Sequence, residues 1–108
     1  MLLVCRFVVS PEQVAEFVER AERALVLLTE APGCLDGSLG RAVDEGNRWV
    51  LVVRFASVVA YRRALSPFPV REHVIPLLSE ALTDEPAGFE TLAEAHAGTV
   101  TIHPTLLA

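Results

Sequence analysis

Apolar side chains recur at every second position in three segments of the chain, and this is the spacing of β-strands. In residues 2–9 and 48–55 both alternating sets are apolar, whereas in residues 34–43 one set stands out, formed by Leu35, Leu39 and Val43. A polar turn at 44–47 separates the second segment from the third, which predicts a hairpin. Strands that are apolar on both sides belong to a sheet whose two faces are both covered.

Helical spacing of apolar residues fills most of the remaining chain. A serine, a proline and a glutamine within residues 10–13 have the pattern of a helix start, and the helix is expected over 11–29, where a Pro-Gly pair follows. Two shorter helices are expected over 57–65 and 66–81, each preceded or begun by a serine cap. Pro76 should bend or interrupt the second of them.

A last core strand is expected around residues 89–95, and residues 99–104 alternate like an extra strand in a tail. The order is then β-α-β-β-α-β, which right-handed crossovers fold into an antiparallel sheet with the helices on one face. The predicted fold class is therefore α+β and ferredoxin-like. A chain of 108 residues supports one core, so we expect a single domain over 1–108, with its core at about 2–95 and a C-terminal tail at 96–108.

The face of the sheet opposite the helices would be apolar as well, because it would carry Leu2, Val4, Val8, Val50 and Val52. Exposed patches of that size are uncommon on monomers. The composition agrees, since 52% of the residues are hydrophobic and the mean hydropathy is +0.42. We therefore predict a homodimer through the sheet face, and the apolar tail could cross onto the partner.

Charge and composition exclude several function classes. The net charge is -5 and the nine basic residues are scattered arginines, so the electrostatic pattern for binding nucleic acid is missing. The absence of lysine excludes lysine Schiff-base chemistry. No apolar run approaches the roughly 18 to 20 residues of a membrane span, and the first residues lack the pattern of a secretory signal, so a cytoplasmic protein is expected. Cys5 and Cys34 have no metal-site or redox-motif spacing and are read as reduced structural thiols.

Several segments together resemble the antibiotic biosynthesis monooxygenase family. The resemblance covers most of residues 2–95 and is carried by Pro32-Gly33-Cys34-Leu35, the apolar strand 49–55, Ala60-Tyr61-Arg62, Leu77-Leu78-Ser79-Glu80 and Phe89-Glu90. It implies a dimeric α/β-barrel. It also implies one of three activities known in the family, namely cofactor-independent oxygenation of polycyclic phenols, quinol oxidation or haem degradation.

Two branches of that family differ in the residues they use. The haem-degrading branch has an axial histidine seven residues after a serine, a spacing that Ser66 and His73 keep here. The other two functional positions of that branch hold Arg63 and Cys5 instead of Trp and Asn, so haem is not the expected cofactor. The polyketide-oxygenase branch has an Asn and a Trp four residues apart, and the matching positions are Val59 and Arg63. No cofactor is expected.

The chain has three histidines that are candidates for chemistry. His73 lies between Val70 and Leu77 at helical spacing, which points it to the apolar side, where it could remove a proton from a phenol. The alternative is a histidine at the edge of the core with a satisfied hydrogen bond. His96 and His103 lie near the tail without Asp, Glu or Cys at ligand spacing, so no metal site is expected.

Aromatic and arginine side chains supply candidates for substrate binding. Trp49, Tyr61 and Phe68 could wall a flat aromatic pocket between sheet and helices. Arg54 and Arg63 could hold a phenolate or a carboxylate through charge-assisted hydrogen bonds. The alternatives are that Trp49 belongs to the core and that the arginines form surface ion pairs.

The chain contains neither a nucleotide-binding glycine loop nor a nucleophile elbow, so hydride transfer and acyl transfer have no support. The leading hypothesis is a cofactor-independent monooxygenase that acts on a small aromatic or quinol-type substrate. One alternative is a non-catalytic dimeric protein that binds a hydrophobic ligand or haem. A further alternative is a structural dimer whose pocket is filled by its own side chains.

Overall fold

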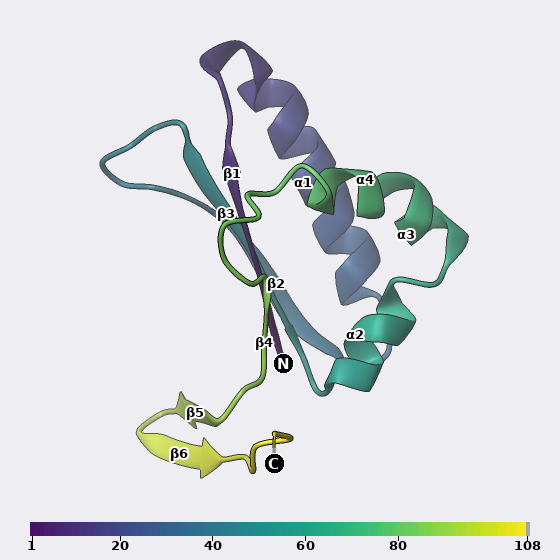
Figure 1. The fold of residues 1–108 in the computed structure, drawn as a ribbon, viewed down its shortest axis with the longest axis vertical. Coiled ribbons are helices and arrows are strands. Elements are labelled where there is room, and N and C mark those ends of the chain that lie inside the picture. The colour runs from purple at the N-terminus through teal and green to yellow at the C-terminus, as the bar shows by residue number, and fades with distance from the viewer. Residues whose placement is uncertain (108) are drawn as a thin grey trace.

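The computed structural model, which describes residues 1–107, contains a four-stranded antiparallel sheet with the helices packed on one face (Figure 1). The strands follow the order β2-β3-β1-β4, with bounds β1 Leu2–Val8, β2 Cys34–Arg41, β3 Arg48–Phe55 and β4 Gly88–Phe89. The helices are α1 Val14–Thr29, α2 Val58–Ala64, α3 Phe68–His73 and α4 Ile75–Leu78, and a short 3-10 turn at Pro11–Gln13 precedes α1. The predicted α+β ferredoxin-like fold is confirmed.

The core lies between the sheet and α1. Alternate residues of the two central strands are buried on the helix side, and α1 packs against them with one buried stripe: Leu3, Cys5 and Phe7 from β1, Leu51, Val53 and Phe55 from β3, and Phe17, Ala21, Ala24 and Leu28 from α1. The alanines let α1 approach the strands closely. This is the alternation that the sequence predicts for the first and third strands.

The second strand departs from the predicted pattern because it contains a bulge. Its pairing with β3 shifts register between Cys34 and Asp36, so Leu35 leaves the ladder and is 52% exposed. Leu39 faces the helices, and the prediction that Leu35 shares its side is therefore wrong. Val43, predicted on the same side, is fully exposed beyond the strand end.

The second helical region is broken, as the proline predicts. α3 ends at His73 and α4 begins at Ile75, because Pro76 in the first turn of α4 cannot donate a backbone hydrogen bond. Ser57 caps α2 through a hydrogen bond that its Oγ accepts from the amide of Ala60 at 3.0 Å. At the predicted helix start within residues 10–13, the Ser10 side chain makes no capping hydrogen bond.

The last predicted strand is wrong beyond Phe89. Only Gly88–Phe89 pairs with β1. The segment before it makes only isolated backbone hydrogen bonds with β1, and Pro86 has no N–H to donate to the sheet. Residues Ala93–His96 (β5) instead pair with Thr99–Ile102 (β6) in a separate two-stranded sheet, which we call the tail hairpin (Figure 1). Ala97 and Gly98, at φ of 51° and 82°, make its tight turn.

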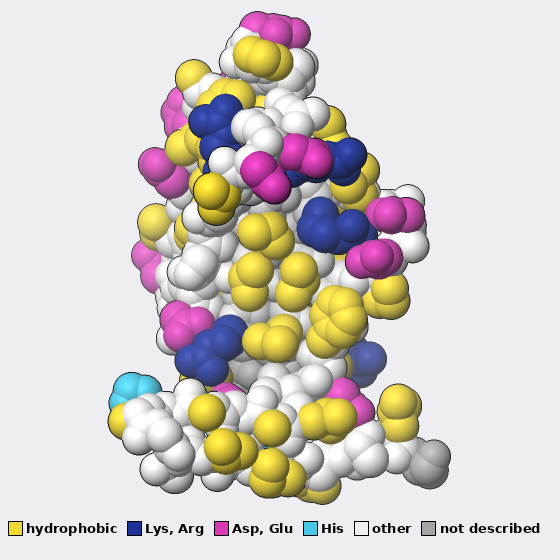
Figure 2. Space-filling view, turned by 90° about the vertical axis from the view of Figure 1, so that its left-hand side faces the viewer, with side chains coloured by type: hydrophobic (Ala, Val, Ile, Leu, Met, Phe, Trp, Pro, Cys, Tyr) yellow, Lys and Arg dark blue, Asp and Glu magenta, His cyan; other side chains and the backbone are white. Residues whose placement is uncertain are grey.

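The sheet face opposite the helices is open in this chain. It carries partly exposed valines, and Figure 2 shows hydrophobic side chains gathered in the middle of this face with charged ones around them: Val4, Val8, Val50 and Val52 lie on these strand positions. The outer side of the tail hairpin adds exposed Val100 and Ile102. Within residues 1–107, no helix has the length and apolar composition needed to cross a bilayer.

Candidate functional site

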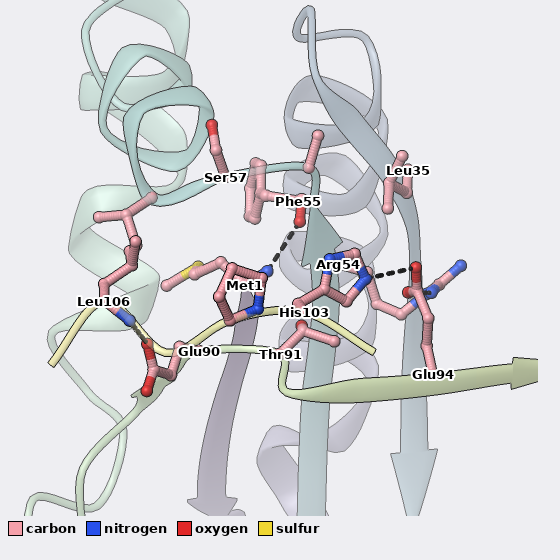
Figure 3. Close-up of a pocket in the computed structure, with 13 residues that line it drawn as sticks. Met1, Leu35, Arg54, Phe55, Ser57, Glu90, Thr91, Glu94, His103 and Leu106 are labelled. Atoms are coloured by element: carbon pink, nitrogen blue, oxygen red, sulfur yellow. Dashed lines mark hydrogen bonds and ion pairs between the residues drawn. The ribbon is translucent and has the colours of Figure 1, made fainter. Parts of the chain in front are cut away.

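Two pockets flank the junction between β3 and α2, where Ala56 and Ser57 line both of them. The helix pocket, about 650 Å³, is formed by the end of α1, the turn into β2, α2 and the start of α3. The tail pocket, about 470 Å³, lies between the end of the main sheet and the tail hairpin (Figure 3). Both volumes lie in the range of small-molecule sites.

Local backbone requirements shape the helix pocket. Gly33 has a φ of +84°, and a Cβ placed there would lie 2.6 Å from the Cβ of Ala60, so only glycine lets α2 pack this closely against the turn. The carbonyl of Gly33 accepts a hydrogen bond from the amide of Ala56 at 2.7 Å, which ties the turn to the end of β3. On α2, Val59 and Arg63 are four residues apart and both line the pocket.

The helix pocket is mainly apolar. Its ionisable lining side chains are Glu30 and Arg63, and the remainder comes chiefly from Leu27, Pro67, Val70 and other small apolar residues. Arg63 takes no part in the ion pairs formed among residues 1–107. Its guanidinium therefore has hydrogen-bond donors to offer to a ligand with an anionic or electron-rich oxygen.

The tail pocket contains a chain of charge-assisted hydrogen bonds (Figure 3). Arg54 donates from Nε and Nη2 to the two carboxylate oxygens of Asp36, both at 2.8 Å, and from Nη1 to Oε2 of Glu94 at 3.3 Å. The other oxygen of Glu94, Oε1, lies 3.0 Å from Nε2 of His103. The hydrogen bond from Arg54 lowers the pKa of the Asp36 carboxyl, and their charge attraction adds to it. Two strands of the main sheet are thus linked to the tail hairpin.

Further hydrogen bonds fix the walls of the tail pocket. The carboxylate of Glu90 accepts from the hydroxyl of Thr105 and from the amide of Leu106, and these bonds lower the pKa of Glu90. The amide of His103 donates to the carbonyl of Leu92 at 2.8 Å, which continues the pairing of the hairpin. The N-terminal ammonium of Met1 donates to the carbonyl of Phe55 at 2.9 Å.

The two predicted arginines line different pockets, Arg63 the helix pocket and Arg54 the tail pocket. Tyr61 lines neither. Its ring packs edge-on against Phe55 at 5.4 Å between centroids, and burial raises the pKa of its hydroxyl. Phe68 is 66% exposed and also lies outside both pockets.

Trp49 lies in the layer between sheet and helices but lines neither pocket. Its ring packs edge-on against Phe17 at 5.6 Å, and the guanidinium of Arg41 covers it at 4.9 Å. Its Nε1 is buried and has no hydrogen-bond partner among the described atoms. The alternative reading of Trp49 as a core residue thus agrees with its packing.

His73, the predicted base, is the last residue of α3 and lies at the molecular surface. Its Nδ1 lies 3.5 Å from Nη1 of Arg23 and its Nε2 lies 3.8 Å from the carboxylate of Glu72. It lines neither pocket, so the described geometry brings neither a phenol site nor a haem cleft to this ring. No group of three or more metal-ligating side chains suited to an ion occurs within residues 1–107.

The sequence pattern assigns no partner to His103, and in the structure Glu94 lies within hydrogen-bond distance of its ring. The register pairs Glu94 with Thr101, and His103 is two residues further along the same face, within reach of a long side chain. The alternating residues 99–104 and the Ala97-Gly98 turn are the signals that could have located this pair.

The family comparison agrees with the fold. A family model described as antibiotic biosynthesis monooxygenase matches residues 1–67, which run from β1 through α2 and include Arg63. A comparison with curated proteins found no match.

Solved structures with the same architecture come from several organisms. SnoaB, a cofactor-independent oxygenase from Streptomyces nogalater, is 28% identical, with 86% of this chain and 96% of that chain covered at a TM-score of 0.63. A conserved protein from Methanosarcina mazei is 21% identical over 78% of this chain and 82% of its own, with a TM-score of 0.65. Rv0793 from Mycobacterium tuberculosis is 18% identical over 97% and 93%, with a TM-score of 0.63, and both of these show the shared fold. With its sheet, helices and matched residues in agreement, this chain belongs to the antibiotic biosynthesis monooxygenase family.

Proposed function

We propose that the protein is a monooxygenase that oxidises a small aromatic or quinol-type substrate without a bound cofactor, and that the helix pocket holds this substrate. The observation that carries the proposal is the position of Val59 and Arg63. The family resemblance assigns these two positions to the reacting site of oxygenases, and both line the same apolar pocket. The similarity to SnoaB, a cofactor-independent oxygenase, supports the same class of reaction.

The reaction would draw on the substrate's own electrons. An anthrone-type substrate loses a proton, its anion passes one electron to O2, and the two radicals combine. One oxygen atom is then retained as a carbonyl, while the second leaves as water with the two hydrogens of the substrate carbon. The protein has to stabilise the anion, exclude water and orient the ring. Arg63 would stabilise the anion, and the apolar lining would exclude water.

Two groups are proposed as the acceptor of the first proton. The sequence favours His73, whereas the geometry favours Glu30, because Glu30 lines the helix pocket and His73 does not. Replacing each residue separately by an uncharged one, His73→Ala or Glu30→Gln, would tell them apart. Only the variant that lacks the true proton acceptor should show a lower rate at saturating substrate.

Oxygen uptake by the purified protein tests the proposal. A panel of hydroquinones and anthrones would be compared with a no-protein control for autoxidation. Arg63→Gln should reduce the protein-dependent rate about 100-fold, as expected for the loss of a donor that stabilises a developing anion. Arg62→Gln is the matched control, because Arg62 is the exposed neighbouring arginine and lines neither pocket. Uptake equal to the control across the panel would refute the oxygenase assignment.

The open sheet face is proposed to pair with a second copy of the chain. Val50 and Val52 lie on this face next to Val4, and burying them would remove an apolar patch from water. Sedimentation should show a dimer, and Val52→Lys should convert it to a monomer. The control is Val43→Lys, at a fully exposed position outside the sheet. A monomeric wild type, or a dimer that Val52→Lys leaves intact, would contradict this interface.

A non-catalytic protein that binds a hydrophobic ligand is the second candidate. It is favoured by one observation, that the positions of the oxygenase Asn and Trp are Val59 and Arg63 here. On this account, aromatic ligands would bind in the helix pocket with no oxygen uptake above autoxidation. Arg63→Gln would then change the dissociation constant alone.

A further inference from the structure

The tail pocket holds an imidazole whose orientation is already fixed. Glu94 lies on β5 of the tail hairpin and His103 directly follows β6, and Nε2 of the ring is 3.0 Å from the carboxylate of Glu94. Because a carboxylate accepts hydrogen bonds, the neutral ring carries its proton on Nε2, and Nδ1 keeps a free lone pair. The amide of His103 is tied to the carbonyl of Leu92, so the backbone that carries the ring is fixed too.

The charged side chains around this imidazole are already engaged. Glu94 is shared between His103 and Arg54, and Arg54 is held by Asp36 through two further hydrogen bonds. Glu90 is occupied by the tail itself. The free Nδ1 of His103 is thus an acceptor with unused capacity in a pocket that also contains the apolar side chains of Met1, Leu35 and Leu106 and the hydroxyls of Ser57 and Thr91 (Figure 3).

We propose that the tail pocket is a second ligand site, which binds a small, largely apolar molecule through one acidic hydroxyl, as in a phenol or an enol. Nδ1 of His103 accepts the hydroxyl proton, and the resulting imidazolium is stabilised by Glu94 on its other nitrogen. His103 is the ligand-binding residue, and Glu94 is a positioning residue that holds the ring.

The charges around the pocket select for this kind of ligand. Asp36, Glu90 and Glu94 outnumber the Arg54 guanidinium and the Met1 ammonium, so a ligand that arrives as an anion is repelled. A neutral phenol avoids that repulsion, and proton transfer to His103 leaves an ion pair with no net charge. The site is separate from the helix pocket and does not depend on the proposed oxygenase activity.

Titration of the full chain with 4-nitrophenol tests the site, because the absorption of this probe reports the ionisation of its hydroxyl. One probe should bind per chain with a larger ionised fraction than the free probe has at the same pH, and amide resonances of Thr91, Glu94 and His103, which line only the tail pocket, should move. 4-Nitrobenzoate, of the same shape but anionic without such a hydroxyl, should bind at least tenfold more weakly. Equal binding of the two probes, or resonance shifts confined to the helix pocket, would overturn the proposal.

Variants separate His103 from the rest of the hairpin. His103→Gln should weaken the binding of 4-nitrophenol about tenfold or more and abolish the ionisation of the bound probe, because a charge-assisted hydrogen bond is lost. His96→Gln, the matched control on the same hairpin, should bind like wild type. Unchanged binding by His103→Gln, or an equal loss in His96→Gln, would contradict the role of His103.

The positioning role of Glu94 is tested by an NMR resonance that folding alone would not change. The Nε2–H proton of His103 should give a resonance protected from exchange in wild type, retained in Glu94→Gln, which keeps an acceptor oxygen, and lost in Glu94→Ala. The probe affinity should follow the same order. If Glu94→Ala kept both the resonance and the affinity, Glu94 would not position the ring. Should His103→Gln fail to fold, these measurements and the wild-type resonance shifts decide the matter alone.

Discussion

Gly33 should be the least replaceable residue of the helix pocket, and its contact with Ala60 allows a quantitative test. A Cβ at position 33 would lie 2.6 Å from the Cβ of Ala60, whereas carbon atoms pack at about 3.5–4.0 Å. α2 would have to move by roughly 1 Å, and overpacking of this kind costs about 1–3 kcal/mol. The φ of +84° adds about 1–2 kcal/mol for a residue with a Cβ. Gly33→Ala should therefore lower the free energy of unfolding by about 2–5 kcal/mol.

A second substitution separates the two contributions. Ala60→Gly removes the Cβ that the new Cβ at position 33 would approach. On its own it should lower the free energy of unfolding by about 1 kcal/mol, because glycine is less favourable than alanine within a helix. In the double variant the clash is relieved and the backbone cost remains. The double variant should therefore be about 1–3 kcal/mol more stable than the sum of the two single effects predicts.

Urea unfolding of the wild type and the three variants measures this coupling. Each protein would be followed by circular dichroism, with the slope of the transition checked for a common two-state model. Effects that add to within about 0.5 kcal/mol would refute the reasoning, because they would mean that Gly33 and Ala60 do not meet. Loss of protein-dependent oxygen uptake in Gly33→Ala, with recovery in the double variant, would also tie this contact to the helix pocket.

Three further predictions concern stability and reactivity. Trp49→Phe should change the free energy of unfolding by no more than about 1 kcal/mol in urea titrations, because losing a buried N–H without a partner offsets the lost packing. The Arg20 guanidinium lowers the pKa of Glu80 through a hydrogen bond, so this pair stabilises the fold above about pH 4 and the benefit is lost as the pH falls through the lower folded-state pKa. Glu80→Gln should flatten that acid dependence, and an unchanged slope in unfolding measured against pH would contradict the pairing. Burial raises the pKa of Cys5 to about 11, so a thiol reagent at pH 8 should label Cys34 first, and mass spectrometry that finds Cys5 labelled first would contradict its burial.

Much of the fold follows from local pattern. The alternation in residues 2–9 and 48–55 survives in the structure because β1 and β3 pair with each other in the middle of the sheet and pack one side of each strand against the helices. The break at Pro76 and the cap at Ser57 are also local, since each depends on one side chain and the backbone within four residues. Features of this kind need no knowledge of distant contacts.

The wrong predictions for β2 and for the last strand come from the backbone register, which no single residue indicates. One extra residue at the Cys34–Asp36 bulge takes Leu35 out of the ladder and separates it from Leu39, which the alternation predicts on the same side. In the same way, the last strand ends at Phe89 because Glu90 binds the tail, a contact that spans 16 residues. Tertiary hydrogen bonds therefore override the apolar pattern in these places.

Each candidate pocket is assembled from segments that lie far apart in the sequence, so local sequence patterns do not show which residues line it. Arg54 and Arg63 look alike in the sequence, yet they line different pockets. His73 has helical spacing with apolar neighbours, but α3 is only six residues long and ends at that position, which leaves the ring at the surface. The pairing of His103 with Glu94 depends on the register of a hairpin, whereas the sequence pattern predicts a last core strand at about 89–95 and a separate strand in the tail.

The most direct test of the proposed function is an incubation with ¹⁸O2. The purified protein and an anthrone would be followed by mass spectrometry, beside Arg63→Gln, Arg62→Gln and a no-protein control. A monooxygenase that works in the helix pocket should yield a quinone that carries one labelled oxygen atom, formed faster than by autoxidation in the wild type and in Arg62→Gln but not in Arg63→Gln. Labelled product that forms at the autoxidation rate in every sample, or at equal enhanced rates in both arginine variants, would contradict a monooxygenase that works in the helix pocket.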